Sequence, residues 1–268
     1  MNRQTLVSEI RTKRSYLCVG LDTDSRKIPV HLQKFPDAIF QFNKEIIDST
    51  RELCIAYKIN TAFYEAEGRK GWEAMEKTVN YIGDSHFRIA DAKRGDIGNT
   101  SSLYARAFFE QMPFDAVTVA PYMGEDSVRP FLEYEGKWTI VLGLTSNKGS
   151  GDFQKLSLKT GNTLYQEVLQ KISSWGSPDN LMFVIGATQS SEFSAIRELL
   201  PDHFFLVPGV GTQGGSLEDI SLNTMNKDVG LLVNVSRAII FASGGEDFAE
   251  QARDAAKGYQ SAMGGLLK

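Results

Sequence analysis

The chain repeats one pattern eight times: a short apolar run, a break of polar, glycine or proline residues, and then a longer segment of helical period. The eight apolar runs span residues 15–20, 54–59, 86–90, 115–119, 138–142, 181–185, 203–207 and 230–235. Amphipathic segments between them include residues 39–52, 72–81, 100–111, 163–173, 192–199 and 247–266. Strands that alternate with helices indicate a parallel sheet covered by helices.

Eight such units favour a closed (β/α)8 TIM barrel, an α/β fold, over an open doubly wound sheet, which more often has about five or six strands. No Pro-, Gly- or Ser-rich linker divides the chain, so we predict a single barrel domain over residues 1–268. One long irregular stretch, at about residues 145–159, is too polar and too interrupted by glycine for a core element. It is either a solvated surface loop or a lid over a site.

The charge balance and the cysteines narrow the class of protein. There are 29 Lys and Arg residues against 33 Asp and Glu residues, which disfavours a nucleic-acid binder because phosphate-backbone binding needs clustered positive charge. Cys18 and Cys54 each lie in an apolar run and are expected to be buried and reduced. No apolar stretch approaches the ~18 residues of a membrane span, and the first residues lack the apolar core of a signal peptide. We therefore expect a cytoplasmic protein that binds neither nucleic acid nor a membrane.

Polar and charged residues follow the apolar runs at most of their carboxyl ends, where the active sites of barrels lie. These residues are Asp22, Lys58, Asn60, Asp91, Lys93, Asp96, Thr145, Ser146, Gly209, Gly211, Gln213, Ser236 and Arg237. Each one taken alone is explained equally well as a turn residue or a helix cap. Because all of them are expected on one rim, together they indicate a functional site.

The densest cluster is D-A-K-R-G-D-I, which begins at Asp91 directly after the third run. Side chains alternate along a strand, so Asp91 and Lys93 point to the same side, and Lys58 on the neighbouring strand can reach the same space. With Asp96 they form an alternating series of charges. A structural ion-pair network is the simpler interpretation, but such a costly arrangement at a barrel mouth more often serves chemistry. A lysine between two carboxylates stays protonated, which makes Lys93 a proton donor and not a Schiff-base nucleophile.

A glycine-rich segment, residues 208–215, follows the seventh run. It matches the G-x-G-x-x-G pattern of dinucleotide-binding folds, but no acidic residue is placed for a ribose after the next strand, so we reject that interpretation. Backbone amides after strand 7 together with Arg237 after strand 8 instead predict the phosphate site common to many barrels.

Metal binding is poorly supported by the sequence. His31, His86 and His203 are scattered along the chain, and the last two fall at strand starts, on the face of a barrel that serves stability. No Cys and His pair has metal-ligand spacing. We therefore expect no metal site, and no Ser-His-Asp set is visible in the sequence.

Five segments together resemble the orotidine 5′-monophosphate decarboxylase family, in the longer of its classes. They are D-A-K-R-G-D-I-G-N-T from Asp91, C-V-G-L-D-T-D from Cys18, A-Y-K-I-N from Ala56, P-G-V-G-T-Q-G-G from Pro208 and N-V-S-R from Asn234. The similarity covers about residues 15 to 240, which is nearly the whole chain. The resemblance implies a TIM barrel that converts orotidylate to uridylate and carbon dioxide in pyrimidine biosynthesis, without cofactor or metal.

The resemblance also implies roles for the charged residues. Lys93 would donate the proton to C6 of the pyrimidine, with Asp91 beside the departing carboxylate. Lys58 and Asp22 would contact ribose hydroxyls, and Lys58 would also orient Asp91. The ammonium group of Lys93 would stabilise the carbanion that forms at C6 and then protonate it.

Contacts with the rest of the substrate follow from the same resemblance. Thr145 and Ser146 would face the pyrimidine, and Gln213 and Arg237 would hold the phosphate. Further candidates for substrate contact are Asn60, Ile97, Pro208, Gly209 and Ser236.

The family pattern implies a homodimer as well. The aspartate and threonine that match Asp96 and Thr100 reach into the site of the partner subunit, so two composite sites form.

Two alternatives stay open at this point. One is a Mg²⁺-dependent phosphate-sugar barrel of the 3-keto-gulonate-6-phosphate decarboxylase or hexulose-phosphate synthase type, which shares D-x-K but carries an acidic residue where this chain has Lys58. The other is a non-catalytic barrel that binds a phosphate ligand.

Overall fold

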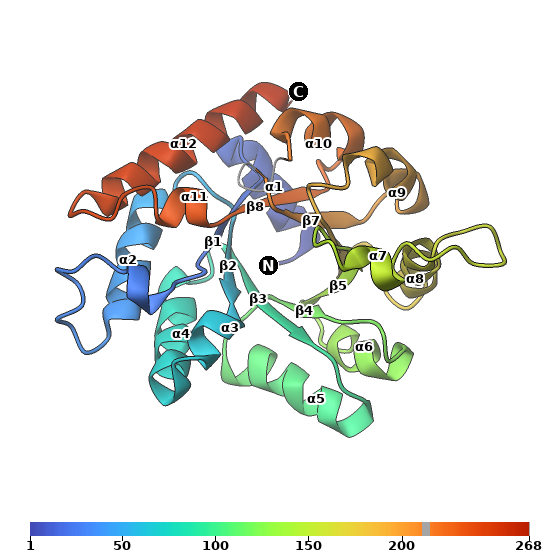
Figure 1. The fold of residues 1–268 in the computed structure, drawn as a ribbon, viewed down its shortest axis with the longest axis horizontal. Coiled ribbons are helices and arrows are strands. Elements are labelled where there is room, and N and C mark those ends of the chain that lie inside the picture. The colour runs from blue at the N-terminus through green and yellow to red at the C-terminus, as the bar shows by residue number, and fades with distance from the viewer. Residues whose placement is uncertain (211–214, 268) are drawn as a thin grey trace.

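The computed structural model describes residues 1–210 and 215–267, in which eight parallel strands close into a barrel (Figure 1). The strands are β1 (Leu17–Gly20), β2 (Ala56–Asn60), β3 (Phe87–Arg94), β4 (Ala116–Val119), β5 (Trp138–Leu144), β6 (Leu181–Ile185), β7 (Phe204–Pro208) and β8 (Leu231–Val235). Each strand pairs with the next along the chain, and β1 pairs with β8 through Leu17 and Val233, which closes the ring. The predicted TIM-barrel fold is confirmed, with one strand in each of the eight apolar runs.

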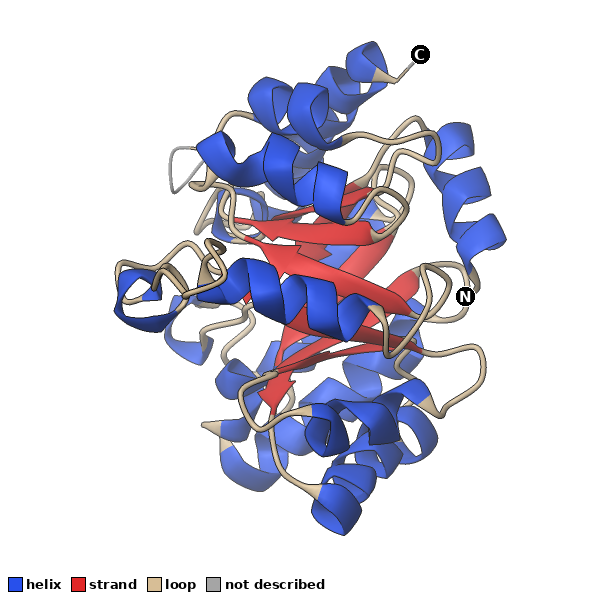
Figure 2. Cartoon of the chain, turned by 90° about the vertical axis from the view of Figure 1, so that its right-hand side faces the viewer, coloured by secondary structure: helices blue, strands red, loops and turns tan. Residues whose placement is uncertain are grey.

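Helices surround the strands (Figure 1), and the side view shows the strands in the centre with helices above, below and in front of them (Figure 2). They are α1 (Arg3–Lys13), α2 (Ala38–Thr50), α3 (Thr61–Glu65), α4 (Gly68–Ile82), α5 (Gly98–Arg106), α6 (Glu125–Leu132), α7 (Ser150–Phe153), α8 (Leu164–Ser173), α9 (Phe193–Leu199), α10 (Leu217–Thr224), α11 (Arg237–Ile240) and α12 (Phe248–Leu266), with short turns η1 (Ser25–Lys27), η2 (Ala107–Gln111) and η3 (Ser190–Glu192). Because helices cover the outer face and side chains fill the interior, the strands are buried almost throughout.

Six of these helices, α1, α3, α6, α7, α10 and α11, lie outside the amphipathic segments named from the sequence. Helix α1 buries only Leu6 and Ile10, so its apolar stripe is weak. Helix α6 contains Pro130, which is normally a helix breaker. Both cover the barrel because tertiary packing overrides local pattern.

Buried ion pairs close the end of the barrel where the strands begin. The amino group of Met1 lies 2.7 Å from Oδ1 of Asp115, and Oδ2 of Asp115 accepts a 2.9 Å hydrogen bond from Nε of Arg88. The indole nitrogen of Trp138 donates to the carbonyl oxygen of Met1 at 2.9 Å. These contacts cover the end of the barrel where the strands begin, and we call the opposite end, where the strands end, the mouth.

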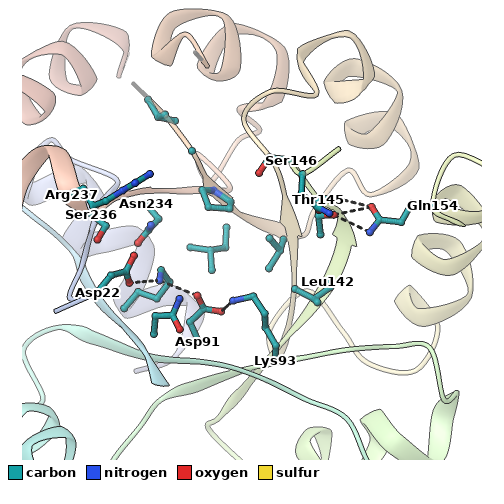
Figure 3. A pocket seen from close by; sticks show the side chains of 18 residues that line it. Asp22, Asp91, Lys93, Leu142, Thr145, Ser146, Gln154, Asn234, Ser236 and Arg237 are labelled. Atoms are coloured by element: carbon teal, nitrogen blue, oxygen red, sulfur yellow. Dashed lines mark hydrogen bonds and ion pairs between the residues drawn. The ribbon is translucent and has the colours of Figure 1, made fainter. Parts of the chain in front are cut away.

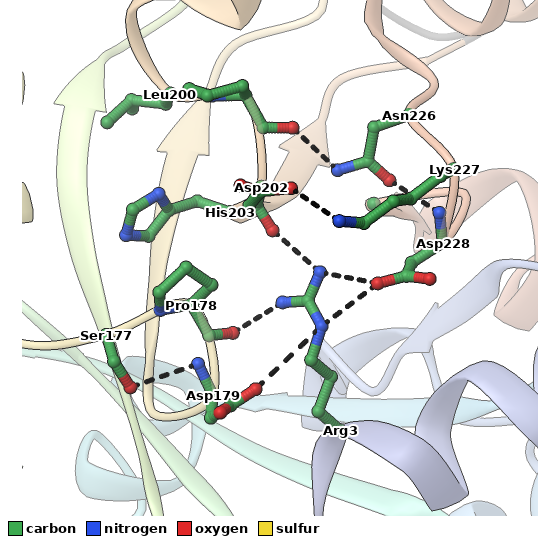
Figure 4. Close-up of polar contacts among 12 residues, drawn as sticks. Arg3, Ser177, Pro178, Asp179, Leu200, Asp202, His203, Asn226, Lys227 and Asp228 are labelled. Carbon is green, nitrogen blue, oxygen red and sulfur yellow. Dashed lines mark hydrogen bonds and ion pairs between the residues drawn. The ribbon is translucent and has the colours of Figure 1, made fainter.

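Arg3 ties helix α1 to the segments that precede β6, β7 and β8 (Figure 4). Its guanidinium donates to the carbonyl oxygens of Pro178 and Asp202, at 2.5 and 2.7 Å, and to a carboxylate oxygen of Asp228 at 2.9 Å. His203 is buried beside this cluster, directly before β7. As predicted, His86 and His203 therefore lie at strand starts, far from the mouth.

Strand β3 is longer than predicted. It runs to Arg94, so Asp91 and Lys93 lie within the strand and the prediction that both follow it is wrong. The extension comes from pairing with β4, in which Arg94 is the partner of Val119.

Residues 145–159 are largely irregular, as predicted, but include the one-turn helix α7. Ser150 in this helix is buried, whereas Phe153 and Leu156 are largely exposed, so the segment is only partly packed.

Candidate active site

A cavity of about 530 Å³ opens at the carboxyl ends of the strands (Figure 3). Its walls are built by Asp22, Lys58, Asn60, Asp91, Lys93, Leu142, Thr145, Ser146, Asn147, Gln154, Val184, Leu206, Pro208, Gly209, Val210, Asn234, Ser236 and Arg237. Both charged and apolar side chains line this cavity, and the apolar ones include Leu142, Val184 and Leu206. A mostly apolar cavity with a few converging polar groups is typical of a small-molecule site.

Lys58 is the most enclosed charge in the cavity. Its ammonium nitrogen lies 3.2 Å from Oδ1 of Asp22 and 3.0 Å from Oδ2 of Asp91. Burial alone disfavours the ammonium form, but the two carboxylates outweigh it and raise the pKa of Lys58 above its ordinary value. Lys58 therefore carries a fixed positive charge that holds both carboxylates in place.

Asp91 bridges the two lysines. Its Oδ1 lies 2.6 Å from the ammonium nitrogen of Lys93, while its Oδ2 faces Lys58. Burial opposes ionisation of Asp91, but Lys58 and Lys93 together hold its pKa well below the usual range. The Lys93 side chain is half exposed to the cavity, so its ammonium group can reach a bound molecule.

The sequence led us to expect Lys93 between two carboxylates. Within one chain, the structure instead places Lys58 in that position. Among the described residues of one chain, Asp91 is the only carboxylate paired with Lys93. The carboxylate of Asp96 instead accepts a hydrogen bond from the backbone N–H of Ile97 at 2.8 Å.

The backbone before Asp22 is fixed on both sides. The N–H of Leu21 donates to the carbonyl oxygen of Lys58 at 2.8 Å, and the Leu21 carbonyl accepts from the Tyr64 hydroxyl at 3.1 Å. Tyr64 is buried, so Asp22 stands on a rigid support.

Thr145, which directly follows β5, is held by three side chains. Gln154 accepts from its backbone N–H at 2.8 Å and donates to its hydroxyl at 2.9 Å. The hydroxyl donates to Asn147 at 2.6 Å, and Gln189 donates to the carbonyl oxygen at 2.9 Å. Sequence reasoning missed Gln154, Gln189 and Asn147, because their segments match no pattern and they meet Thr145 only in the folded chain.

The opposite wall lies where β7 and β8 end. Ser236 donates to the carbonyl oxygen of Gly20 at 2.9 Å, and a Cβ atom on Gly20 would lie 2.7 Å from that of Ser236, so only glycine permits this approach. Arg237 begins α11 and Gly209 has a φ of 98°, which glycine adopts without strain. Asn234 also lines the cavity and was not singled out as a site residue.

The structure brings eleven of the predicted site residues to this one cavity: Asp22, Lys58, Asn60, Asp91, Lys93, Thr145, Ser146, Pro208, Gly209, Ser236 and Arg237. Asp96, Ile97 and Thr100 do not line it, and the Ile97 side chain is 54% exposed. Gln213 and Gly211 lie outside the described residues.

Within residues 1–210 and 215–267, no group of three or more His, Cys, Asp or Glu side chains is arranged to hold a metal ion. At the mouth, the ammonium of Lys58 occupies the space between Asp22 and Asp91 and would repel a divalent cation there. In the same part of the chain, no helix has the length and apolar character needed to cross a membrane. Cys18 and Cys54 are buried and unpaired with each other, as predicted.

Comparison with known proteins finds one family that matches nearly the whole chain. Residues 15–252 match the family model described as orotidine 5′-phosphate decarboxylase / HUMPS family. Proteins named orotidine 5′-phosphate decarboxylase from Bacteroides fragilis and Flavobacterium johnsoniae are 58% and 55% identical to the chain. Both alignments cover all of this chain, with 99% and 98% of the respective relatives.

Solved structures agree with the sequence relatives. The structure of Leishmania donovani OMP decarboxylase has a TM-score of 0.81 and 34% identity over 97% of this chain and 99% of that chain. The structure of Leishmania donovani UMP synthase has a TM-score of 0.81 and 36% identity over 95% of this chain, but only 56% of that chain.

Proposed function

Because the chain belongs to the orotidine 5′-phosphate decarboxylase family, we propose that the ammonium group of Lys93 protonates C6 of the pyrimidine when this enzyme decarboxylates orotidine 5′-phosphate. The single observation that carries this proposal is the placement of the Lys93 ammonium 2.6 Å from Asp91 at the mouth of the barrel. The product would be uridine 5′-phosphate, so the enzyme would serve pyrimidine nucleotide biosynthesis.

The reaction sets a clear demand on the site. When the bond between C6 and the carboxylate breaks, carbon dioxide leaves and its bonding electron pair stays on C6, in the plane of the ring. The π system cannot delocalise that pair, so it must be stabilised by a nearby positive charge. A proton then passes from Nζ of Lys93 to C6, which gives a neutral uracil ring and leaves Lys93 as the amine.

The charges of the cavity meet this demand without rearrangement. Lys58 holds Asp91 through Oδ2, and Asp91 in turn holds Lys93 through Oδ1. Both lysines keep Asp91 ionised. Its negative charge would then lie next to the carboxylate of the bound substrate. The fixed ammonium of Lys93 stabilises the carbanion directly, and Asp91 would in addition repel the substrate carboxylate.

Different residues of the cavity would bind the phosphate, the ribose and the pyrimidine of the substrate. Arg237 offers a bidentate fork for the phosphate beside Gly209, and Gln213 would complete that end. Asp22 and Lys58 would contact the ribose, and Thr145 and Ser146 would face the pyrimidine. The same group of proposed contacts includes Asn60, Ile97, Pro208 and Ser236. Phosphate binding, remote from the bond that breaks, supplies binding energy that can order the charges and the segment at residues 145–159 as a lid.

Two subunits would share each site. Asp96 and Thr100 lie outside the cavity of their own chain, and the exposed Ile97 side chain lies between them in sequence. This placement supports a homodimer in which Asp96 and Thr100 reach the partner's substrate, so that Lys93 gains its second carboxylate from the other chain. The buried, free thiols of Cys18 and Cys54 fit a reducing, cytoplasmic location.

The decisive experiment follows the fall in ultraviolet absorbance as orotidine 5′-phosphate is converted, with and without EDTA. We expect full turnover in both conditions, because no step needs a metal ion. Activity lost in EDTA and restored by Mg²⁺ would favour the Mg²⁺-dependent phosphate-sugar barrel. Ligand binding without turnover would favour a non-catalytic barrel and would refute the proposal.

A further inference from the structure

Lys93 has an unusual backbone. Its φ is 46°, in the left-handed region that residues with a side chain rarely adopt. It lies in a bulge of the β3–β4 pairing, where β3 advances four residues, from Ala90 to Arg94, against two of β4, from Val117 to Val119. A bulge of this kind interrupts the ladder and leaves backbone groups without their usual partners.

One side chain, that of Thr118, fills this gap. Thr118 is the β4 residue opposite the bulge, and it is fully buried. Its hydroxyl oxygen accepts a 2.9 Å hydrogen bond from the backbone N–H of Lys93. The same hydroxyl donates to Oδ1 of Asp91 at 3.1 Å. It therefore replaces the missing ladder partner of Lys93 and orients the carboxylate oxygen that contacts the Lys93 ammonium.

We propose that Thr118 is a positioning residue of the decarboxylation: its hydroxyl fixes the left-handed backbone of Lys93 and the carboxylate of Asp91 in one geometry. The inference rests on the proposed role of Lys93. Thr118 does not line the cavity, so it acts through these two residues and touches no substrate. A rotation of the Lys93 backbone would move the ammonium away from C6, and a displacement of about 1 Å can cost about 100-fold in rate.

Among the residues that the structure describes, no other group duplicates this role. The Lys58 ammonium holds the opposite oxygen of Asp91, Oδ2, and makes no contact with the Lys93 backbone. Valine has the shape of threonine without its hydroxyl, so Thr118→Val removes both hydrogen bonds and keeps the packing of β4. Thr118→Ser keeps the hydroxyl and loses only a methyl group.

The chain offers a matched control on the neighbouring strand. Thr139 in β5 is also fully buried, and its hydroxyl has no hydrogen-bond partner among the described residues. Thr139→Val therefore makes the same chemical change in the same barrel wall without touching Asp91 or Lys93. Any effect common to both valine variants reports on the barrel and not on positioning.

The experiment compares steady-state kinetics and uridine 5′-phosphate affinity for these three variants and the wild type. We expect Thr118→Val to lower kcat at least about 10-fold, with KM and product affinity within about 3-fold, because only the reacting groups move. Thr118→Ser should recover most of kcat, and Thr139→Val should match the wild type. An unchanged kcat in Thr118→Val, an equal loss in Thr139→Val, or no rescue by serine would overturn the inference.

Two further measurements keep the result decisive. If Thr118→Val does not fold, as judged by circular dichroism, Thr118→Ala is tested against Thr139→Ala with the same expectations. Lys93→Ala is measured in parallel: if it keeps turnover, the proposed function fails, whereas an inactive Lys93→Ala with a fully active Thr118→Val defeats only the role of Thr118.

Discussion

The ammonium nitrogen of Lys93 lies 2.6 Å from Oδ1 of Asp91, two residues earlier on the same strand. Both side chains line the cavity, although the bulge at Lys93 interrupts the regular alternation of β3. The contact pairs the proposed proton donor with the negative charge proposed to face the departing carboxylate.

Removal of the Lys93 ammonium should abolish the reaction and spare nucleotide binding. We expect Lys93→Ala to lose at least about 10³-fold in kcat, because no other group at C6 can stabilise or protonate the carbanion. Calorimetric titration with uridine 5′-phosphate should still detect binding through the phosphate end. Lys44→Ala, which breaks an exposed pair with Asp48 on α2, serves as the control and should leave turnover unchanged. Near-normal turnover of Lys93→Ala would rule out Lys93 as the proton donor.

Shared sites predict rescue between two inactive variants. Lys93→Ala and Asp96→Ala proteins should each be inactive alone, but a hybrid dimer would contain one site with both residues intact. Random exchange of subunits should therefore restore about a quarter of the wild-type activity. Exchange is verified by mass spectrometry of differently labelled chains. The absence of any rescue after verified exchange would count against the shared site.

Arg237 should act on the phosphate alone. A charge-assisted, bidentate contact is worth about 1.5–3 kcal/mol, so Arg237→Ala should weaken uridine 5′-phosphate binding by about 10- to 100-fold. Affinity for uridine, which lacks the phosphate, should be unchanged. Arg253→Ala, in an exposed pair with Glu52, provides the matched control. Equal losses for nucleotide and nucleoside would place Arg237 elsewhere in the recognition of the ligand.

His203 should make the fold sensitive to acid. Burial, reinforced by Arg197 and Arg3, lowers its pKa from 6.5 to about 4. The unfolded chain therefore binds a proton that the folded chain refuses between these two values, so stability falls as pH drops from about 6.5 toward 4 and levels off below. Neither ring nitrogen has a partner among the described residues, and the ring packs edge-on against Phe183.

Phenylalanine at this position tests the point directly. His203→Phe should reduce the slope of unfolding free energy between pH 6 and 5 by up to about 1.4 kcal/mol per pH unit, measured by urea denaturation. His86, whose pKa is also lowered to about 4, remains in the variant and continues to contribute. A slope identical to that of the wild type would contradict the assignment.

The positions of the strands and most of the cavity could be predicted from the sequence for a physical reason. Barrel strands are buried on both faces, so each is a dense apolar run, and the residues after the runs converge because all the strands point the same way. Asp22, Lys58 and Arg237 were found in this manner, although they are far apart in the chain. The charged motif from Asp91 to Asp96 then indicated which family of barrel enzymes the chain resembles.

The remaining features depend on contacts that no local pattern encodes. Strand β3 continues to Arg94 because β4 supplies a partner, so its true end could not be read from apolar residues alone. Thr118 looks like any threonine in a strand, and Gln154 looks like a loop residue; both matter through hydrogen bonds to distant residues. Lys58 lies between two carboxylates because of side-chain packing across β1, β2 and β3, whereas sequence order suggested Lys93.

The left-handed backbone of Lys93 carries a lesson for protein engineering. A side chain in that conformation costs about 1–2 kcal/mol, and glycine would avoid the cost while deleting the ammonium group. Selection for thermal stability alone would therefore favour Lys93→Gly, which is expected to be inactive. Thermal stability and catalytic activity therefore make opposite demands on residue 93. Variants selected for both properties should keep Lys93 and carry their stabilising substitutions elsewhere in the chain.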